Sequence, residues 1–439
     1  MLNKNLGLLI LLSFSMLDFS AYSQESGRTS ETLNKIKDLP GVNNIQPAAN
    51  QGRTAAGRGE VYVLAFEQPV DHQKPDGAKF LQRVFVTHTG YDKPVVLNTE
   101  GYAAFGIGDS GELGAMLGSC NVVTVEHRYF GSSVPSPLDW KYLTVKNAAD
   151  DLHAIVSSLK KLYTGKWIST GTSKGGQTAL FYKCYYPDDV NATVAYVAPV
   201  NVAQEDPRYD VFIKTAGDEA TRKRIKEFQI AMFKREAEIL PLLHLNEADY
   251  SMGTAKAYEY GVLEYPYYFW QYALSPDAVP APDASAQALA DHYMKTNTIF
   301  YYSDRGKKQF EPFLYQAFTE IGYYNYDITD FKTVMKVLKE PTNLDICPPG
   351  TKESIAYAPD TMAFVFNFLR YKAQNVIFIY GDLDIYSATQ MQLLGRTNSI
   401  KIVVEGQHHG ARISSFSPEQ KELLYSNLEK WLDMKLARP

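Results

Sequence analysis

The stretch Ile168-Ser169-Thr170-Gly171-Thr172-Ser173-Lys174-Gly175-Gly176-Gln177 joins a short apolar run to a run of helical character. Its Gly171-x-Ser173-x-Gly175 pattern is typical of a nucleophile elbow, where a serine occupies a strained turn between a strand and a helix. Glycines are expected on both sides of the serine, because such a turn leaves no room for side chains there. The stretch therefore predicts a nucleophilic Ser173 on an α/β scaffold.

The composition is that of a globular protein with a large core. The chain has 439 residues, of which 45% are hydrophobic and 21% charged, and its formal net charge is -5. This balance, without any run of Lys or Arg, argues against nucleic acid or an anionic membrane surface as a partner. Oligomeric state is left open.

The N-terminal residues 1–23 are predicted to be a signal peptide. Lys4 precedes an apolar run at residues 6–17, and Ala21-Tyr22-Ser23 offers a small-x-small cleavage site. The apolar run is shorter than the ~20 residues that a membrane span needs. We therefore expect a secreted or periplasmic protein that begins at Gln24.

Residues 24–59 are polar and are expected to form a flexible lead-in, followed by the first part of the core at residues 60–200. Apolar runs there predict strands at 61–66, 80–87, 95–98, 121–125, 166–170 and 192–198, with an amphipathic helix at 147–163. Strands that alternate with helices predict an α/β-hydrolase fold with a mostly parallel sheet.

The alternation stops at residues 201–374, where helical pieces and aromatic residues predominate. A structureless loop of this length would be unusual, so we expect an inserted, mainly helical cap domain. The second part of the core is predicted at residues 375–439, with strands at 376–380 and 400–404 and a C-terminal helix.

An acid and a histidine follow these last two strands. A serine needs a base to take its proton, and the base needs an orienting acid; α/β-hydrolases supply them in the chain order Ser, Asp, His. Asp382 and Asp384 both follow the first of the two strands, and His408 and His409 both follow the second. Order and position both fit Ser173 as the nucleophile. The choice between the two acids and the choice between the two histidines stay open at this point.

The backbone N–H of Lys174, next after the nucleophile, is the expected first donor of an oxyanion hole, and that of Tyr102 the second. The side chain of Lys174 is expected to face solvent or to form a surface ion pair. Scattered histidines and three distant cysteines give no metal-ligand spacing, and no cofactor is indicated. One disulfide among Cys120, Cys184 and Cys347 remains possible.

Several motifs resemble those of the bacterial secreted tripeptidyl aminopeptidases, a family of serine peptidases. They are Asn98-Thr99-Glu100-Gly101-Tyr102, Glu126-His127-Arg128-Tyr129-Phe130-Gly131, Thr170-Gly171-Thr172-Ser173-Lys174-Gly175-Gly176 and Val194-Ala195-Tyr196-Val197-Ala198-Pro199. The prolyl carboxypeptidase group is more distantly similar. The resemblance implies a hydrolase fold and peptide substrates, with short peptides, often tripeptides, released from free N-termini and proline preferred before the scissile bond.

The family's catalytic serine falls on Ser173, its acid in a Y-G-x-x-D pattern on Asp384, and its histidine in a G-x-x-H-G-A pattern on His409. The distant group has its histidine two residues after the glycine, which would select His408. Glu100, beside the expected oxyanion hole, is the candidate to bind the substrate's α-ammonium group; a structural carboxylate is the alternative. Glu126, His127 and Arg128 are interpreted mainly as a structural polar network.

Two other functions fit less well. An exported esterase or lipase would use the same three residues, and a binding protein without activity would have no need of the ordered Ser, Asp and His. Glu100 and the aromatic cap favour the peptidase.

Overall fold

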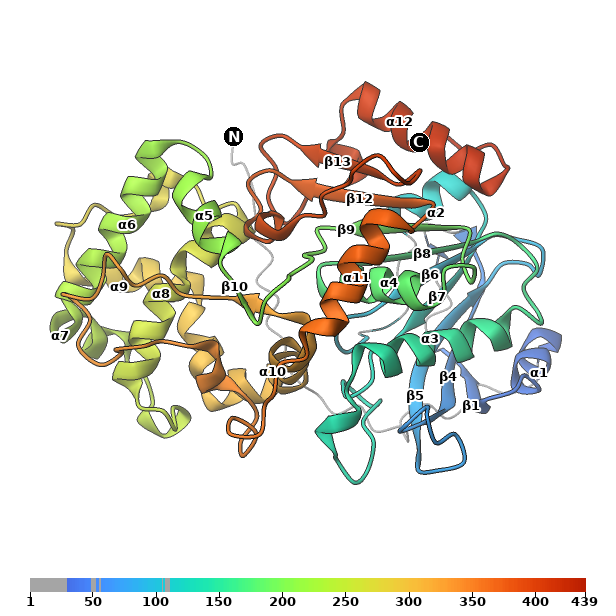
Figure 1. The fold of residues 1–439 in the computed structure, drawn as a ribbon, viewed down its shortest axis with the longest axis horizontal. Helices are drawn as coiled ribbons and strands as arrows, with labels where there is room; N and C mark the ends of the chain where they lie inside the picture. The colour runs from blue at the N-terminus through green and yellow to red at the C-terminus, as the bar shows by residue number, and fades with distance from the viewer. Residues whose placement is uncertain (1–29, 49–52, 55–56, 105, 107–110) are drawn as a thin grey trace.

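A sheet of nine strands forms the centre of the molecule (Figure 1). The computed structural model describes residues 30–48, 53–54, 57–104, 106 and 111–439. The strands of this sheet are β1 (Val42–Pro47), β4 (Glu60–Pro69), β5 (Lys79–His88), β6 (Val95–Thr99), β7 (Asn121–Val125), β8 (Trp167–Thr172), β9 (Ala192–Tyr196), β12 (Val376–Gly381) and β13 (Ile400–Val404). They lie in the order β1-β4-β5-β7-β6-β8-β9-β12-β13.

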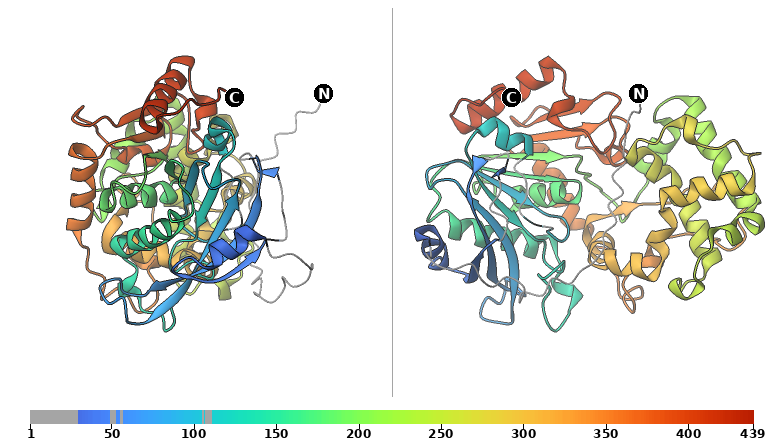
Figure 2. Two further views of the ribbon diagram at one scale, coloured as in Figure 1. Left: turned by 90° about the vertical axis from the view of Figure 1, so that its right-hand side faces the viewer. Right: turned by 180° about the vertical axis from the view of Figure 1, so that it is seen from behind.

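The six strands from β7 to β13 run parallel, whereas β1, β4 and β5 form an antiparallel edge. Helices α3 (Val145–Leu159), α4 (Lys174–Tyr185) and α11 (Pro359–Tyr371) lie on one side of the sheet, and α2 (Gly111–Leu117) and α12 (Pro418–Leu432) lie on the other (Figures 1 and 2). This is the α/β-hydrolase fold, as predicted.

Both faces of the parallel sheet are covered, so its strands are apolar on both sides. On β6 the side chains alternate: Val95 and Leu97 pack in the cluster that contains the α3 residues, and Val96 packs in the one formed with α2 and α12. This double burial explains why these strands are mostly apolar in sequence rather than alternating.

Part of the expected lead-in is regular structure. Helix α1 (Glu31–Lys37) begins at the cap residue Ser30, and β1 pairs antiparallel with β4 at the edge of the sheet. Ile36 and Ile45 are buried in the core beside this edge. The expectation of a flexible segment over all of 24–59 was therefore wrong for residues 31–47. This stretch is mostly polar in sequence, but its two isoleucines are buried in the core and anchor the chain. The predicted signal peptide lies outside the described residues.

A helical lobe lies beyond the end of the sheet and forms the cap (Figure 1). It contains α5 (Arg208–Thr215), α6 (Glu219–Lys234), α7 (Glu236–Ile239), α8 (Thr254–Tyr272), α9 (Ala286–Thr296) and α10 (Asp304–Gln316), with the short parallel pair β10 (Glu205–Asp206) and β11 (Tyr323–Tyr324). The predicted interval 201–374 also includes α11, but this helix lies beside α4 in the layer that covers the sheet (Figure 1).

The long helix α8 is the centre of the cap. Tyr258, Tyr260 and Tyr265 on this helix are fully buried, and Tyr260 stacks on Tyr302 at a ring distance of 4.9 Å. The aromatic residues that dominate this part of the sequence therefore form the cap's own core.

No disulfide joins Cys120, Cys184 and Cys347, so the bridge that the sequence left possible is not formed. Across the described ranges, none of the helices combines the length and the apolar character required to cross a membrane.

Candidate active site

Ser173 lies between β8 and α4 with φ 57° and ψ -123°, a conformation that side-chain-bearing residues rarely adopt. Its N–H donates to the carbonyl of Tyr196 at 2.8 Å, which holds the turn against the neighbouring strand β9. A Cβ on Gly171 would lie 2.3 Å from the backbone of Gly175, and a Cβ on Gly175 would lie 2.6 Å from the carbonyl of Thr99. The strained turn thus requires both glycines of the motif.

The loops after β12 and β13 bring one acid and one histidine together. Asp384 has no exposed surface, and its Oδ2 accepts a hydrogen bond from Nδ1 of His409 at 2.8 Å. Its Oδ1 accepts from the N–H of Tyr386 at 3.2 Å, so both carboxylate oxygens are held. Because Nδ1 of His409 faces the carboxylate, its Nε2 is left to exchange a proton.

The two alternative residues have other surroundings. Nδ1 of His408 lies 2.6 Å from the carbonyl of Trp270, at the end of cap helix α8. The N–H of His409 donates to the next carbonyl of this helix end, that of Gln271, at 3.2 Å. Asp382 donates its backbone N–H to Val404, and its Oδ1 is buried without a hydrogen-bond partner.

Ser173 Oγ is not hydrogen bonded to His409 in this structure. Such bonds are often long in the absence of substrate and shorten when it binds. The ring of His409 packs against Tyr386, with 5.0 Å between the ring centroids.

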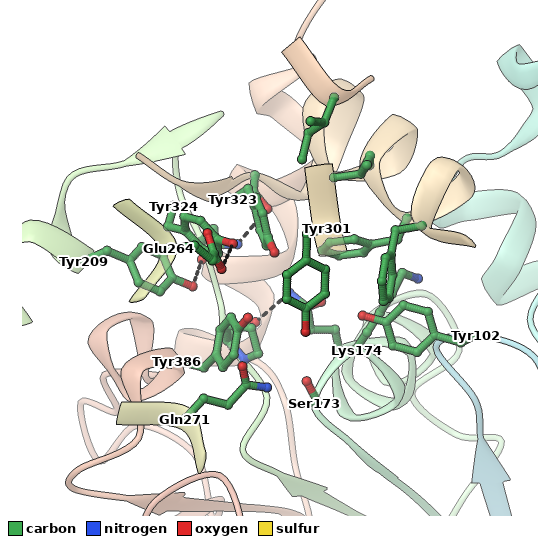
Figure 3. A pocket seen from close by; sticks show the side chains of 18 of the residues that line it. Tyr102, Ser173, Lys174, Tyr209, Glu264, Gln271, Tyr301, Tyr323, Tyr324 and Tyr386 are labelled. Carbon is green, nitrogen blue, oxygen red and sulfur yellow. Dashed lines mark hydrogen bonds between the residues drawn. The ribbon is translucent and has the colours of Figure 1, made fainter. Parts of the chain in front are cut away.

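A cavity of about 230 Å³ opens between the elbow and the cap (Figure 3). Ser173, Lys174 and Tyr102 line its floor on the sheet side. The cap contributes Glu264 and a wall of aromatic side chains, among them Tyr301 and Tyr323. The predicted nucleophile thus faces a cavity whose wall is largely aromatic and includes one acid from the cap.

The side chain of Lys174 does not face solvent, so the expectation of a surface lysine was wrong. It is only 2% exposed, and its Nζ lies 3.3 Å from Nε2 of His127. The loop at Gly101 covers it: a Cβ on that glycine would lie 2.6 Å from Cβ of Lys174. Burial lowers the pKa of Lys174 to about 7.

His127 is the partner of this lysine, and its pKa is held well below the usual range by burial and by Lys174. Its Nδ1–H donates to the carbonyl of Arg128 at 2.8 Å, which leaves Nε2 as the acceptor for Lys174. Its backbone N–H donates to the carbonyl of Tyr102 at 3.2 Å. His127 thus connects the two predicted oxyanion donors, Lys174 and Tyr102.

The rest of this motif forms a buried network, in keeping with the structural interpretation. Arg128 makes two hydrogen bonds of 2.7 Å to Asp151, and neither side chain is exposed. Glu126 is bound by Arg83 and by the hydroxyl of Ser133.

Glu100 is not among the residues that line the cavity. Burial, with a contribution from the nearby Glu126, raises its pKa to about 7. The acid that does line the cavity is Glu264, which was missed in the sequence. It lies in the aromatic run at residues 258–272 of α8, and the only signal was an acid among tyrosines.

A serine on a strained strand-to-helix turn of an α/β-hydrolase fold, facing a capped cavity, is the arrangement of the serine hydrolases. Residues 29–438 match the family described as PS-10 peptidase S37. The chain belongs to this family and is a serine peptidase, which confirms the resemblance found in the sequence.

The chain is similar to the prolyl tri/tetrapeptidyl aminopeptidase of Streptomyces mobaraensis, with 31% identity over 423 residues that cover 92% of this chain and 85% of the relative. It is also similar to the lysosomal Pro-X carboxypeptidase of Mus musculus, with 31% identity over 165 residues, covering 31% of this chain and 32% of the relative. Among solved structures, the proline iminopeptidase of Mycobacterium smegmatis aligns with a TM-score of 0.37 and 12% identity, covering 84% of this chain and 97% of that one.

Proposed function

We propose that this peptidase is an aminopeptidase that releases short peptides, above all tripeptides, from free N-termini, with proline preferred before the scissile bond. Ser173, Asp384 and His409 act as its catalytic triad. The observation that carries the proposal is the 2.8 Å contact between His409 Nδ1 and Asp384 Oδ2, in a site whose serine opens into a capped cavity. The name of the Streptomyces relative supports the substrate class.

In this mechanism Ser173 Oγ attacks the carbonyl carbon of the scissile bond while His409 Nε2 takes its proton. Collapse of the tetrahedral intermediate breaks the C–N bond, and His409 donates the proton to the leaving amine. Water then attacks the resulting ester, with His409 again as the base, and frees the short peptide and Ser173. Asp384 keeps Nδ1–H oriented throughout.

The oxyanion would be bound by the backbone N–H groups of Lys174 and Tyr102. The N–H of Lys174 is in the first turn of α4, where N–H groups lack an acceptor within the helix. The hydrogen bond from His127 to the carbonyl of Tyr102 supports the second donor by fixing its loop.

A cap over the cavity favours an exopeptidase, because a folded chain could not pass through it to place an internal bond at Ser173. Glu100 is the sequence-based candidate for binding the substrate's α-ammonium group, and it lies two positions before Tyr102. It can be tested by Glu100→Gln, which should reduce cleavage of peptides with a free amino group if Glu100 binds that group.

The predicted signal at residues 1–23 supports a secreted or periplasmic location. N-terminal sequencing of the protein from an exporting host tests this: a mature protein that begins at Gln24 is expected, and a retained N-terminus would contradict export.

Cleavage of an Ala-Ala-Pro p-nitroanilide with a free N-terminus, compared with its N-acetyl form, a longer acetylated peptide and a short-chain ester, tests the function. Cleavage of the free-amino amide much faster than of the acetylated forms, lost in Ser173→Ala, is expected. Equal cleavage of the acetylated forms would indicate an endopeptidase, and ester cleavage without amide cleavage would indicate an esterase.

A further inference from the structure

The buried carboxylate of Glu264 lies in the wall of the cavity that exposes Ser173. Glu264 is 7% exposed, and its oxygens accept hydrogen bonds from the hydroxyls of Tyr324 at 2.6 Å, Tyr326 at 2.7 Å and Tyr302 at 3.1 Å. In the part of the chain that the structure describes, no Lys, Arg or His side chain forms an ion pair with it. Both oxygens are therefore fixed in direction, but their charge is not balanced.

Buried carboxylates in proteins are normally paired with a cation, because burial of an isolated charge is costly. Three neutral hydroxyls support the ionised form of Glu264, yet burial outweighs them and raises its pKa to about 7. A cation that entered the cavity would complete the pair and keep the carboxylate ionised. Among the described residues, none supplies that cation, so the site can accept one from a ligand.

We propose that Glu264 binds the α-ammonium group of the peptide substrate. This inference rests on the proposed aminopeptidase function and assigns the residue that recognises the N-terminus. A primary ammonium carries its donors on one small atom, which suits a carboxylate with three of its acceptor sites already used. The rings of Tyr301 and Tyr323, which line the same cavity, can also attract a cation.

The arrangement of the cavity fits this assignment. Glu264 lies on one side and Ser173 on the other, with Tyr301 and Tyr386 between them (Figure 3). A peptide bound by its ammonium group at Glu264 would extend across the cavity, and the bond that reaches Ser173 would depend on its length. The separation of the two residues would then select how many residues are released.

Glu100 is the competing candidate. It does not line the cavity, and burial together with the like charge of Glu126 disfavours its ionised form. Glu264 is also buried, but three tyrosine hydroxyls favour its ionised form. Glu264 therefore offers the better receptor for an ammonium group.

The experiment compares Glu264→Gln with Glu264→Asp, Glu100→Gln and the control Glu259→Gln. Glu259 is also buried on α8 without a cationic partner, but it accepts hydrogen bonds from the backbone N–H groups of Lys336 and Leu338 and does not line the cavity. Each folded variant is assayed for kcat/KM on Ala-Ala-Pro p-nitroanilide with a free or acetylated N-terminus. Calorimetry on Ser173→Ala, with and without Glu264→Gln, measures affinity for the two forms of Ala-Ala-Pro amide.

For Glu264→Gln we expect kcat/KM on the free-amino substrate to fall about 10- to 100-fold, the range for loss of a charged hydrogen bond. Cleavage of the acetylated substrate should not fall, and the affinity of the Ser173→Ala protein for the free-amino peptide should fall similarly. Glu264→Asp, which keeps the charge, should retain more of the preference. If Glu264→Gln does not fold, Glu264→Asp and the Ser173→Ala affinities for the two peptides still test the site.

The assignment is overturned if Glu264→Gln keeps the wild-type preference for a free amino group, if Glu100→Gln loses that preference instead, or if Glu264→Gln and Glu259→Gln lose cleavage of both substrates equally. Equal affinity of the Ser173→Ala protein for the two peptides also overturns it. Failure of the proposed function would look different, because wild-type enzyme would then cleave both forms alike or neither form.

Discussion

Nζ of Lys174 lies 3.3 Å from Nε2 of His127, and neither side chain reaches solvent to any extent. This contact joins the residue after the nucleophile to a histidine whose backbone N–H holds the carbonyl of Tyr102. The two backbone donors proposed for the oxyanion hole are therefore linked through a single pair of side chains. The pair also carries a large electrostatic cost, because burial lowers the pKa of Lys174 to about 7.

Replacing Lys174 by methionine should stabilise the protein at neutral pH while it lowers kcat. Between the lowered pKa near 7 and the ordinary value of 10.5, the unfolded chain binds more protons than the folded protein. Wild-type stability should therefore rise with pH in that window by up to ~1.4 kcal/mol per unit, a rise that Lys174→Met should lack. Urea unfolding at several pH values measures this, and parallel curves for the two proteins would contradict it.

The contribution of Glu264 to the free energy of unfolding should depend on pH with the opposite sign. Its pKa is raised from 4.5 to about 7, so the folded protein binds more protons than the unfolded chain in this window. Wild-type stability should fall as pH rises from 4.5 to about 7. Glu264→Gln should be more stable than wild type by about 1–3 kcal/mol above neutral pH, and the difference should disappear in acid. Thermal unfolding of both proteins across this pH range measures the difference. If Glu264→Gln were less stable than wild type at every pH, burial of the ionised carboxylate would not carry the free-energy cost assigned to it.

Ser173→Ala should remove peptide hydrolysis and leave the fold intact. Loss of a triad nucleophile typically lowers kcat by about 10⁴- to 10⁶-fold. Because the substitution by alanine removes no contact that supports the turn, the melting temperature should stay close to that of wild type. Activity in the purified variant within about tenfold of wild type would require another nucleophile.

The two adjacent histidines should respond differently to replacement by glutamine. His409→Gln should lower kcat about as much as loss of the serine, since His409 is the only histidine among the described residues that Asp384 binds. His408→Gln should keep most of the activity and cost about 1 kcal/mol of stability, because it loses one hydrogen bond to the carbonyl of Trp270. Steady-state kinetics on both variants decide between them, and the reverse order of effects would move the base to His408.

Asp151→Asn should be strongly destabilising although it lies outside the cavity. The variant leaves the guanidinium of Arg128 buried without its counter-ion, a change that typically costs about 3–5 kcal/mol. The neighbouring Asp150→Asn is the matched control: Asp150 is buried too, but its partners are the half-exposed Lys146 and the hydroxyl of Tyr186, so no buried cation is left unpaired and the loss should be only about 1 kcal/mol. Urea unfolding gives both values, and similar losses would mean that Arg128 finds other partners.

The sequence predicted the fold and the elbow because both follow from local patterns. Strands buried on both faces are mostly apolar, and the glycines at 171 and 175 indicate a steric requirement of the turn. Chain order also led to two candidate acids and two candidate histidines after β12 and β13, from which the family motifs selected Asp384 and His409. The sequence could not predict the different surroundings of the two histidines, because the carbonyl of Trp270 that binds His408 comes from a distant helix.

The burial of the Lys174 side chain and the position of Glu264 in the cavity wall were missed for a related reason. The burial of Lys174 depends on the loop at Gly101 crossing the start of α4, a contact between segments that are far apart in the sequence. Glu264 is fixed by three tyrosines at positions 302, 324 and 326, none of which is near it along the chain. In a region with so many tyrosines, no local pattern distinguishes the ones that meet at an acid.

Helix α8 carries Glu264 and also ends on the loop of the proposed base, where Gln271 and Trp270 accept hydrogen bonds from His409 and His408. Gln271 lies seven positions after Glu264 on the same helix, a rise of about 10 Å, with Pro266 between them. A displacement of the cap would therefore carry the ammonium receptor and the histidine loop together. In the proposed function, the number of residues removed and the position of the base would both depend on α8, so a variant that bends this helix should disturb both.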